Sequence, residues 1–345
     1  MLKFSKTSLA TKCSPNDFTF QQILGHGAFG FVLKAQHKPT GTVLAAKFQQ
    51  IIFDPKSDEA KIFSSKASKF RNLKREINGL RRADSPYVTG YYGLMIMEKY
   101  VLLCMELMDF TADYLYNEVR KTVDSKTGRF DEKALGIIAT SIIKALLYLK
   151  FNLELMHRDV KPSNILLNLN GDVKLGDLGL ACHIDVSAAK SVAAGSTIYI
   201  SPEILDGRQQ LLPGENKIEF SARSDLWSLG VTLVEIARLK HPYSYCNTET
   251  ETIIAISMED PPILTELDGY SVELVKLINS CLTQDPKLRS RVEELVKMKA
   301  VEQYENLEQN KTYMESFVKQ YMENRERNES SESELLETIR NLKLN

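Results

Sequence analysis

The sequence predicts an α+β fold in which a small lobe rich in β-strands precedes a larger, mainly helical lobe. Two short strands, 31–35 and 43–47, flank a Lys-Pro-Thr-Gly turn and predict a hairpin near the N-terminus. Apolar residues recur at helical spacing in the segment 73–80, and 134–151 is the most apolar stretch of the chain, expected to be a buried central helix. The 345 residues suffice for one two-lobed unit with a tail.

A glycine-rich loop begins just before the hairpin. Segment 25–32 reads Gly-His-Gly-Ala-Phe-Gly-Phe-Val, and glycines at this spacing let backbone amides approach phosphates closely. The same spacing opens dinucleotide-binding folds, but there a helix begins at the glycines, whereas here a strand follows. The pattern therefore predicts a hairpin that covers a nucleotide.

A polar segment further along the chain carries the chemistry. Segment 157–164 reads His-Arg-Asp-Val-Lys-Pro-Ser-Asn, and an Asp-Leu-Gly triplet begins at Asp177 after a short hydrophobic run. Phosphoryl transfer mainly requires in-line placement of the reactants and neutralisation of charge on the phosphate oxygens. Asp159 is expected to accept the proton of the substrate hydroxyl, and Lys161 to steady the transferring phosphate. Asn164 and Asp177 are the predicted Mg²⁺ ligands.

A lysine and a glutamate complete this set. Lys47 ends the second strand of the hairpin, where a cation can pair with the α- and β-phosphates of a nucleotide and with a helix carboxylate. Glu76 borders the apolar face of the helix predicted at 73–80 and is the expected partner. Each residue alone would be an ordinary surface charge. Their order relative to the glycine-rich loop and the catalytic segment predicts a functional pair.

Together these motifs resemble the eukaryotic protein kinases. A narrower resemblance is to the dual-specificity MAP kinase kinases, particularly those that act on stress-activated MAP kinases. It is carried by segment 157–164, by the hinge-like segment 104–109 (Cys-Met-Glu-Leu-Met-Asp) with Asp113 and Tyr116 after it, and by the length and pattern of segment 185–195. The resemblance implies a bilobal protein kinase fold, with ATP and Mg²⁺ as cofactors.

The resemblance also assigns binding and structural residues. Those implied to bind ATP are Leu24, Gly25, Gly27, Gly30, Val32, Lys47, Met105, Glu106 and Met108. Glu203 is implied to pair with Arg289 inside the large lobe, and Asp225 to anchor the backbone of the catalytic loop. These last three are structural positions and take no part in the chemistry.

Two serines are the implied regulatory positions. The resemblance places activating phosphorylation at Ser187 and Ser191, and each phosphate would add negative charge that can pair with Arg158 beside the catalytic aspartate. Without the resemblance, both serines would be read as small loop residues in an Ala/Ser-rich stretch.

By resemblance the chain divides into a short extension 1–17, a kinase domain 18–300 with an N-lobe 18–104 and a C-lobe 109–300, and a charged helical tail 301–345. In the tail, an apolar stripe at helical spacing requires a partner surface. The stripe consists of Met314, Phe317, Val318, Tyr321 and Met322. Two alternatives are open: the stripe packs on the C-lobe of the same chain, or it is a docking segment for an upstream kinase, as a similar region is in the family.

Composition and charge argue against several other classes of protein. The net charge of −1 does not favour binding to nucleic acid, and the five scattered cysteines favour neither zinc nor disulfides. The N-terminus lacks a long apolar core and a glycine after the methionine, so no membrane association is predicted. The expected location is cytoplasmic, with the nucleus as a second compartment.

The sequence therefore predicts a transferase, a MAP kinase kinase with a MAP kinase as substrate and a MAP kinase kinase kinase upstream. Phosphorylation of both Thr and Tyr is implied by the family alone. Two other hypotheses remain: a Ser/Thr kinase with a substrate other than a MAP kinase, and a pseudokinase that acts as a scaffold. Every catalytic position is filled, which argues against the scaffold.

Overall fold

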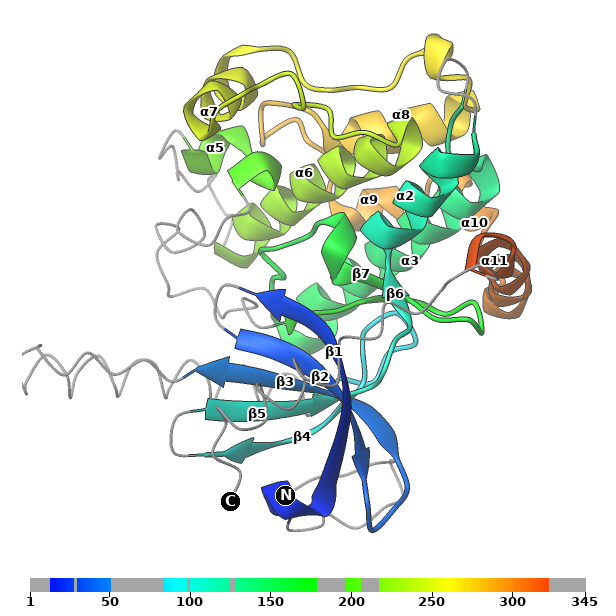
Figure 1. Cartoon of the computed structure of the whole chain (residues 1–345). Helices are drawn as coiled ribbons and strands as arrows, with labels where there is room; N and C mark the ends of the chain where they lie inside the picture. Colours follow the sequence, from blue (N-terminus) through cyan, green and yellow to red (C-terminus); the bar gives the residue numbers. More distant parts are fainter. Residues whose placement is uncertain are drawn as a thin grey trace, which may run out of the picture. The chain divides into compact units, whose positions relative to one another are not determined.

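The computed structural model describes residues 13–27, 30–50, 83–97, 100–123, 128–178, 197–205 and 217–322 (Figure 1). The chain divides into two compact units. The first contains the described residues up to Asp84 together with Thr89–Met108, and the second contains Ser85–Val88 and the described residues from Asp109 onward. The first unit is a β-sheet and the second is mainly helical, so the predicted α+β, bilobal fold class is confirmed.

The first unit is a five-stranded antiparallel sheet in the order β1-β2-β3-β5-β4. A short 3₁₀ turn, Pro15–Asp17, precedes it. The strands are β1 (Phe18–Gly27), β2 (Gly30–His37), β3 (Val43–Gln50), β4 (Tyr91–Ile96) and β5 (Tyr100–Met105). One face of the sheet buries a core of apolar side chains: Phe18, Leu33, Ala35, Leu44, Ala46, Phe48, Met95, Leu102 and Cys104. The predicted hairpin is confirmed as β2 and β3, but β3 continues past Lys47 to Gln50, so Lys47 lies inside the strand and does not end it.

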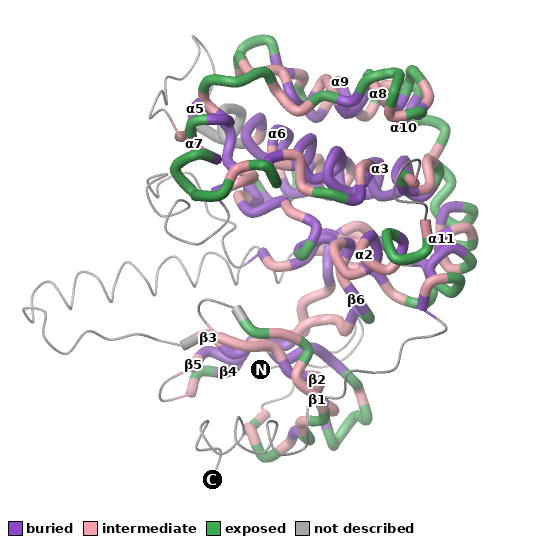
Figure 2. The backbone as a smooth tube through the Cα atoms, turned by 45° about the horizontal axis from the view of Figure 1, so that its top comes forward, coloured by how far each residue is buried: buried purple, intermediate pink, exposed green. Residues whose placement is uncertain are grey.

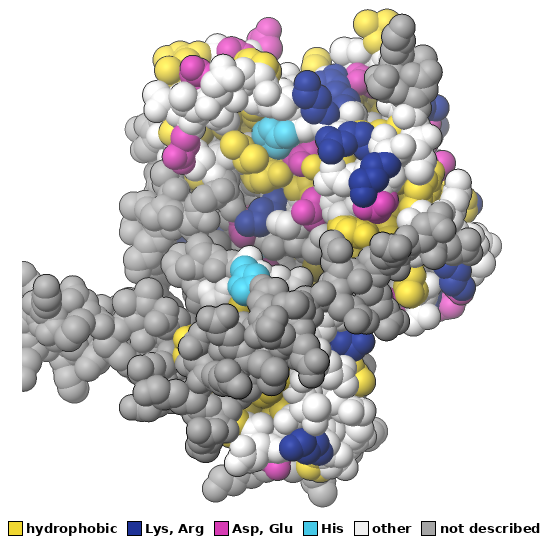
Figure 3. Space-filling view, in the orientation of Figure 1, with side chains coloured by type: hydrophobic (Ala, Val, Ile, Leu, Met, Phe, Trp, Pro, Cys, Tyr) yellow, Lys and Arg dark blue, Asp and Glu magenta, His cyan; other side chains and the backbone are white. Residues whose placement is uncertain are grey.

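The second unit is built around two long helices, α3 (Glu132–Tyr148) and α6 (Lys217–Arg238), which pack against each other. Its other elements are β6 (Phe110–Thr111), α2 (Ala112–Thr122), η2 (Leu149–Leu153), η3 (Pro162–Asn164), β7 (Ile165–Leu167), β8 (Val173–Leu175), η5 (Thr197–Tyr199), α5 (Pro202–Leu205), α7 (Glu249–Met258), η6 (Glu266–Asp268), α8 (Val272–Cys281), α9 (Val292–Leu295), α10 (Lys299–Glu302) and α11 (Leu307–Met322). The long helices are buried along most of their described length (Figure 2). Acidic and basic side chains are interspersed on the face of this unit in Figure 3.

Helix α3 is the buried central helix that the apolar stretch 134–151 predicts. Asp131 caps its N-terminus by accepting a hydrogen bond from the Ala134 backbone N–H at 2.7 Å. Of the thirteen residues from Ala134 to Leu146, all except Lys144 are buried, and the segment ends in the π-helical turn η2. Its length and hydropathy would suffice for a membrane span, but most of it is packed inside the unit.

Candidate catalytic site

The catalytic segment brings three of the predicted residues into direct contact. The Asp159 carboxylate accepts a hydrogen bond from the Lys161 ammonium at 2.8 Å and from the Asn164 side-chain amide at 2.9 Å. The same amide nitrogen also donates to the Asp159 carbonyl at 2.6 Å. The lysine ammonium and the amide N–H together orient the carboxylate of the predicted general base.

A short hairpin connects the two predicted metal ligands. Strands β7 and β8 pair antiparallel, and the Gly176 backbone N–H donates to the Asn164 carbonyl at 2.8 Å, which places Asn164 close to Asp177 in the chain fold. The His157 imidazole is hydrogen-bonded to the Gly176 carbonyl at 2.7 Å and holds the same end of the hairpin. Asp177 itself adopts φ of 51°, in the left-handed region that non-glycine residues seldom occupy. Such conformations concentrate at functional sites.

Asp225, on α6, holds the backbone of the catalytic loop. Its two carboxylate oxygens accept hydrogen bonds from the backbone N–H groups of His157 and Arg158, at 2.8 and 2.7 Å. Burial raises the pKa of this carboxyl, and the two N–H bonds act in the opposite direction by favouring the charged form. Arg158 has φ of 66°, so the anchor holds a turn that the backbone would not readily adopt alone. The implied scaffold role of Asp225 matches this geometry.

The implied partners Glu203 and Arg289 form a buried ion pair. The Arg289 guanidinium donates to both carboxylate oxygens of Glu203, at 2.8 and 2.9 Å. It also donates to the backbone carbonyl of Arg223 at 3.0 Å and to that of Thr283 at 2.9 Å. The pair ties α5 to the loop before α9.

Most of the residues implied to bind ATP lie on the sheet of the first unit, and Glu106 and Met108 follow its strand β5. Lys47 lies on β3 between Val32 of β2 and Leu103 of β5, and Gly25 is opposite Val32 on β1. Met105 ends β5, where it pairs with Ala45 of β3. The sheet therefore fixes the backbone positions of the lysine and the glycine-rich strands relative to one another.

Glu106 and Gly30, which are also among the residues implied to bind ATP, make contacts that support the sheet. The Glu106 carboxylate accepts a hydrogen bond from the Gly90 backbone N–H at 2.9 Å, so its side chain braces the end of the sheet. A methyl group on Gly30 would lie 1.7 Å from the Phe48 carbonyl oxygen. Strand packing therefore requires glycine at this position. Leu24 is exposed and Met108 is buried, while Gly27 lies opposite Gly30 where β1 and β2 meet.

Three predicted residues lie outside the described part of the chain. They are Glu76, Ser187 and Ser191. The Lys47–Glu76 pair and the pairing of phosphoserines with Arg158 stay predictions.

Comparison with known proteins agrees with this geometry. A model of the protein kinase domain matches residues 18–301. The chain is 34% identical over 310 residues to dual specificity mitogen-activated protein kinase kinase sek-1 of Caenorhabditis elegans, covering 90% of this chain and 85% of that protein. The chain belongs to the MAP kinase kinases.

Two other members of this protein kinase family show similar identity. MAP kinase kinase mkk-4 of Caenorhabditis elegans is 36% identical over 275 residues, which cover 79% of this chain and 70% of that protein. Dual specificity mitogen-activated protein kinase kinase 7 of Homo sapiens is 33% identical over 293 residues, or 85% of this chain and 64% of the human protein. The predicted enzyme class, a protein kinase of the MAP kinase kinase type, is confirmed.

Protein kinases use ATP and a divalent metal ion, and the donor set of this kinase fits Mg²⁺. The Asn164 amide nitrogen is engaged by two acceptors of Asp159, which leaves the amide oxygen as the group available to a cation. That oxygen and the Asp177 carboxylate are hard ligands of the type Mg²⁺ prefers. A bound Mg²⁺ would neutralise charge on the phosphate oxygens.

A buried network near α7 was missed by the sequence reasoning. The Glu235 carboxylate of α6 accepts hydrogen bonds from the Tyr116 hydroxyl of α2 at 2.6 Å and from the Tyr199 hydroxyl of η5 at 2.7 Å. The Thr197 hydroxyl donates to Glu249 of α7 at 2.5 Å. These bonds fix the turn η5, Thr197–Tyr199. The available signal was one carboxylate inside the otherwise apolar run 229–237.

His241 lies beside this network and is expected to make the kinase sensitive to acid. Burial lowers the pKa of His241 to about 4. In the unfolded chain, this imidazole takes up a proton as the pH falls below its ordinary pKa of about 6.5. In the folded chain, the imidazole stays neutral until about pH 4. The unfolded state is favoured progressively across that window. We expect His241→Phe to flatten the fall in thermal unfolding midpoint between these two pH values.

The control for this prediction is His26→Phe, at an exposed imidazole of the first unit. That variant is expected to keep the wild-type pH dependence. An equally steep fall in the His241→Phe protein would contradict the prediction.

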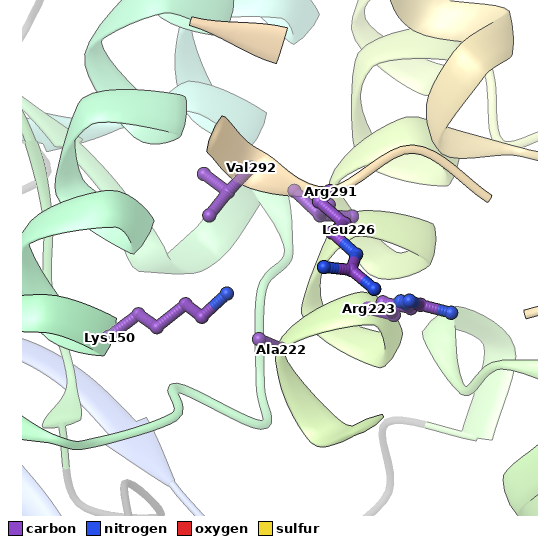
Figure 4. Close-up of a pocket in the computed structure, with 6 residues that line it drawn as sticks. All are labelled: Lys150, Ala222, Arg223, Leu226, Arg291 and Val292. Atoms are coloured by element: carbon purple, nitrogen blue, oxygen red, sulfur yellow. The ribbon is translucent and has the colours of Figure 1, made fainter. Parts of the chain in front are cut away.

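A pocket in the second unit is lined by residues outside the predicted site (Figure 4). These residues are Lys150, Ala222, Arg223, Leu226, Arg291 and Val292. Two of the cations already have structural partners, since Lys150 pairs with Glu293 at 2.6 Å and Arg223 donates to the Pro286 carbonyl at 2.6 Å. The pocket lies among η2, α6 and the start of α9 and is best explained as a packing gap between these elements.

Proposed function

We propose that this kinase phosphorylates both the threonine and the tyrosine in the activation loop of a stress-activated MAP kinase. The observation that carries the proposal is the similarity over 90% of the chain to a relative named as a dual specificity mitogen-activated protein kinase kinase. A MAP kinase kinase kinase would act upstream, through phosphorylation of Ser187 and Ser191. The hinge-like segment 104–109 and the pattern of segment 185–195 support the same assignment.

The residues of the catalytic loop supply the steps of this reaction. Asp159 would accept the proton of the attacking hydroxyl, and Lys161, which is bonded to the same carboxylate, would contact the transferring phosphate. Asn164 orients the carboxylate through its amide nitrogen. Because each group is held before substrate arrives, little reorganisation is needed during transfer.

The test is a phosphate-transfer assay on a folded stress-activated MAP kinase that has been made catalytically inactive. The enzyme would carry Ser187→Glu and Ser191→Glu, and the labelled residues would be mapped by mass spectrometry. Label on both the threonine and the tyrosine of the activation loop, absent with an Asp159→Ala enzyme, supports the proposal. Label on generic proteins alone would overturn the MAP kinase assignment and leave a Ser/Thr kinase with another substrate.

Activation should depend on the two serines. Replacing Ser187 and Ser191 by alanine is expected to hold activity at the basal rate after treatment with an upstream kinase, because no phosphate is then available to pair with Arg158. The measurement is the ratio of substrate phosphorylation rates before and after treatment. Ser244→Ala, at an exposed serine near α7, is the control and should activate normally. Full activation of the double variant would contradict the assignment.

A further inference from the structure

The apolar stripe of the tail is covered by the same chain. Met314 and Val318 are completely buried, and the Phe317 ring packs edge-on against Phe130 with ring centroids 5.4 Å apart. Helix α11 lies against α2 and α3 in the second unit (Figure 1), with buried and exposed positions interspersed along it (Figure 2). Of the two alternatives for the stripe, this structure shows the packing on the C-lobe.

A second contact of α11 is with the turn that joins β7 to β8. A methyl group on Gly171 would lie 2.0 Å from the Lys311 carbonyl oxygen and 2.7 Å from the Glu315 backbone nitrogen. The backbone of the turn thus approaches the backbone of the helix directly. Gly171 also has φ of 82°, so both its conformation and its surroundings require glycine.

Polar contacts fix the same turn to the helix. The Lys311 ammonium pairs with the Asp172 carboxylate at 3.0 Å. Asn168 shapes the turn, since its side-chain oxygen accepts from the Asp172 backbone N–H at 2.9 Å and its nitrogen donates to the Asp172 carboxylate at 2.8 Å. Asp172 is therefore held in place to receive the lysine.

A third contact joins α11 to the start of α3. The Tyr313 hydroxyl donates to Asp131 at 2.8 Å, and Asp131 is also the N-cap of α3. The Lys133 ammonium lies 4.2 Å from the centre of the Tyr313 ring. These contacts leave α11 fixed to a long buried helix on one side and to the β7–β8 turn on the other.

The β7–β8 hairpin links this turn to the catalytic site. Each of its strands has three residues, which span about 10 Å. Asn164 and Asp177 lie at the open end of the hairpin, and Gly171 lies at its closed end. A short paired hairpin moves as one piece, so a shift at the turn reaches the metal ligands.

We infer that α11 is a positioning element for catalysis: it clamps the β7–β8 turn and thereby holds Asn164 and Asp177 in their working geometry. Any change that lifts α11 from the turn lowers the rate of phosphoryl transfer and weakens the metal site, even though none of the predicted catalytic residues lies on α11.

Gly171→Ala tests the clamp, with Gly269→Ala as its matched control. Both glycines have positive φ, 82° and 72°, but a methyl group on Gly269 meets only the flexible end of Arg129 at 3.3 Å. The two variants therefore share the conformational strain, and only Gly171→Ala pushes against a helix backbone. The assay uses a generic protein substrate, so its outcome does not depend on which MAP kinase the enzyme recognises.

Gly171→Ala is expected to lower kcat by about tenfold, in line with the cost of misplacing catalytic groups, with little change in KM for the protein substrate. The half-saturating Mg²⁺ concentration should rise. In the ligand-free protein, hydrogen exchange of the 165–175 amides should accelerate. Gly269→Ala should leave kcat, the half-saturating Mg²⁺ concentration and the hydrogen-exchange rates within about twofold of wild type. Unchanged kcat, Mg²⁺ dependence and exchange in Gly171→Ala would overturn the inference.

A second variant covers the case in which Gly171→Ala does not fold. Val318→Ala loosens α11 from its own side, and Val292→Ala removes the same group from a buried position on α9. Both should lose stability, but only Val318→Ala should accelerate exchange at 165–175 and raise the Mg²⁺ requirement. Equal behaviour of the two valine variants would show that α11 has a structural role alone.

Discussion

Replacing Asp159 by alanine is expected to lower the turnover number by about 10²–10⁴-fold, the range typical for loss of a general base. The reason is geometric as well as chemical. The Asp159 carboxylate is the common acceptor of Lys161 and the Asn164 amide, at 2.8 and 2.9 Å. Without it, the substrate hydroxyl has no base, Lys161 loses its bond to this carboxylate, and Asn164 keeps its bond to the backbone carbonyl of residue 159. The measurement is the steady-state rate of phosphate transfer, with KM for ATP determined in parallel.

Two further variants distinguish the role of Asp159 as a proton acceptor from its role in orienting neighbouring side chains. Asp159→Asn keeps the volume of the side chain and still offers an acceptor to Lys161, but it cannot take up a proton at neutral pH. It should therefore lose nearly as much activity as the alanine variant. Asp260→Ala, at an exposed aspartate after α7, should have wild-type turnover. Turnover within about threefold of wild type in Asp159→Asn would exclude general-base catalysis by this residue.

The parts of the fold that could be predicted from the sequence are those whose signal is local. The β2–β3 hairpin follows from two short strands around a Pro- and Gly-containing turn, and α3 follows from one long apolar run. The catalytic loop is equally local, because Asp159, Lys161 and Asn164 lie within six residues of one another. Their contacts in the structure are the ones that such spacing allows.

Contacts between residues that are far apart in the sequence leave no local pattern by which they could be predicted. The Glu235 network joins residues of α2, η5 and α6 that are 36 to 119 positions apart, and no periodicity connects them. Helix α6 shows the same limit, since it begins at Lys217. Its first two turns, Lys-Ile-Glu-Phe-Ser-Ala-Arg-Ser, lack a continuous apolar run that would mark the start of a buried helix.

The surface that α11 packs on could not be predicted from the sequence either. An amphipathic stripe requires a partner surface but does not specify which one, and the sequence left two alternatives open. Gly171 could be read as a turn residue, but nothing local indicates that Lys311 and Glu315 approach its backbone. Only the fold brings a position in the middle of the chain against the tail helix.

The largest expected effect on stability is at the Glu203–Arg289 pair. The Arg289 side chain is fully buried and that of Glu203 is 3% exposed, so each charge depends on the other for compensation. Burial opposes ionisation of Glu203, but the hydrogen bonds and charge of Arg289 outweigh it and hold the pKa of this carboxyl below its ordinary value. Glu203→Ala or Arg289→Ala should lower the free energy of unfolding at pH 7 by about 3–5 kcal/mol, because either change leaves an uncompensated buried charge.

A less buried pair of the same chemistry is the control. Arg238 also makes two hydrogen bonds to a carboxylate, to Asp268 at 2.7 and 3.0 Å, but its side chain is 34% exposed. Arg238→Ala should therefore cost only about 0–1 kcal/mol in the same denaturant titration. A double replacement, Glu203→Leu with Arg289→Met, should recover part of the loss of either single variant, since an apolar pair leaves no charge to compensate. Single variants at Glu203 and Arg289 that cost no more than Arg238→Ala would show that water reaches the pair, and that α5 is attached to the C-lobe by other contacts.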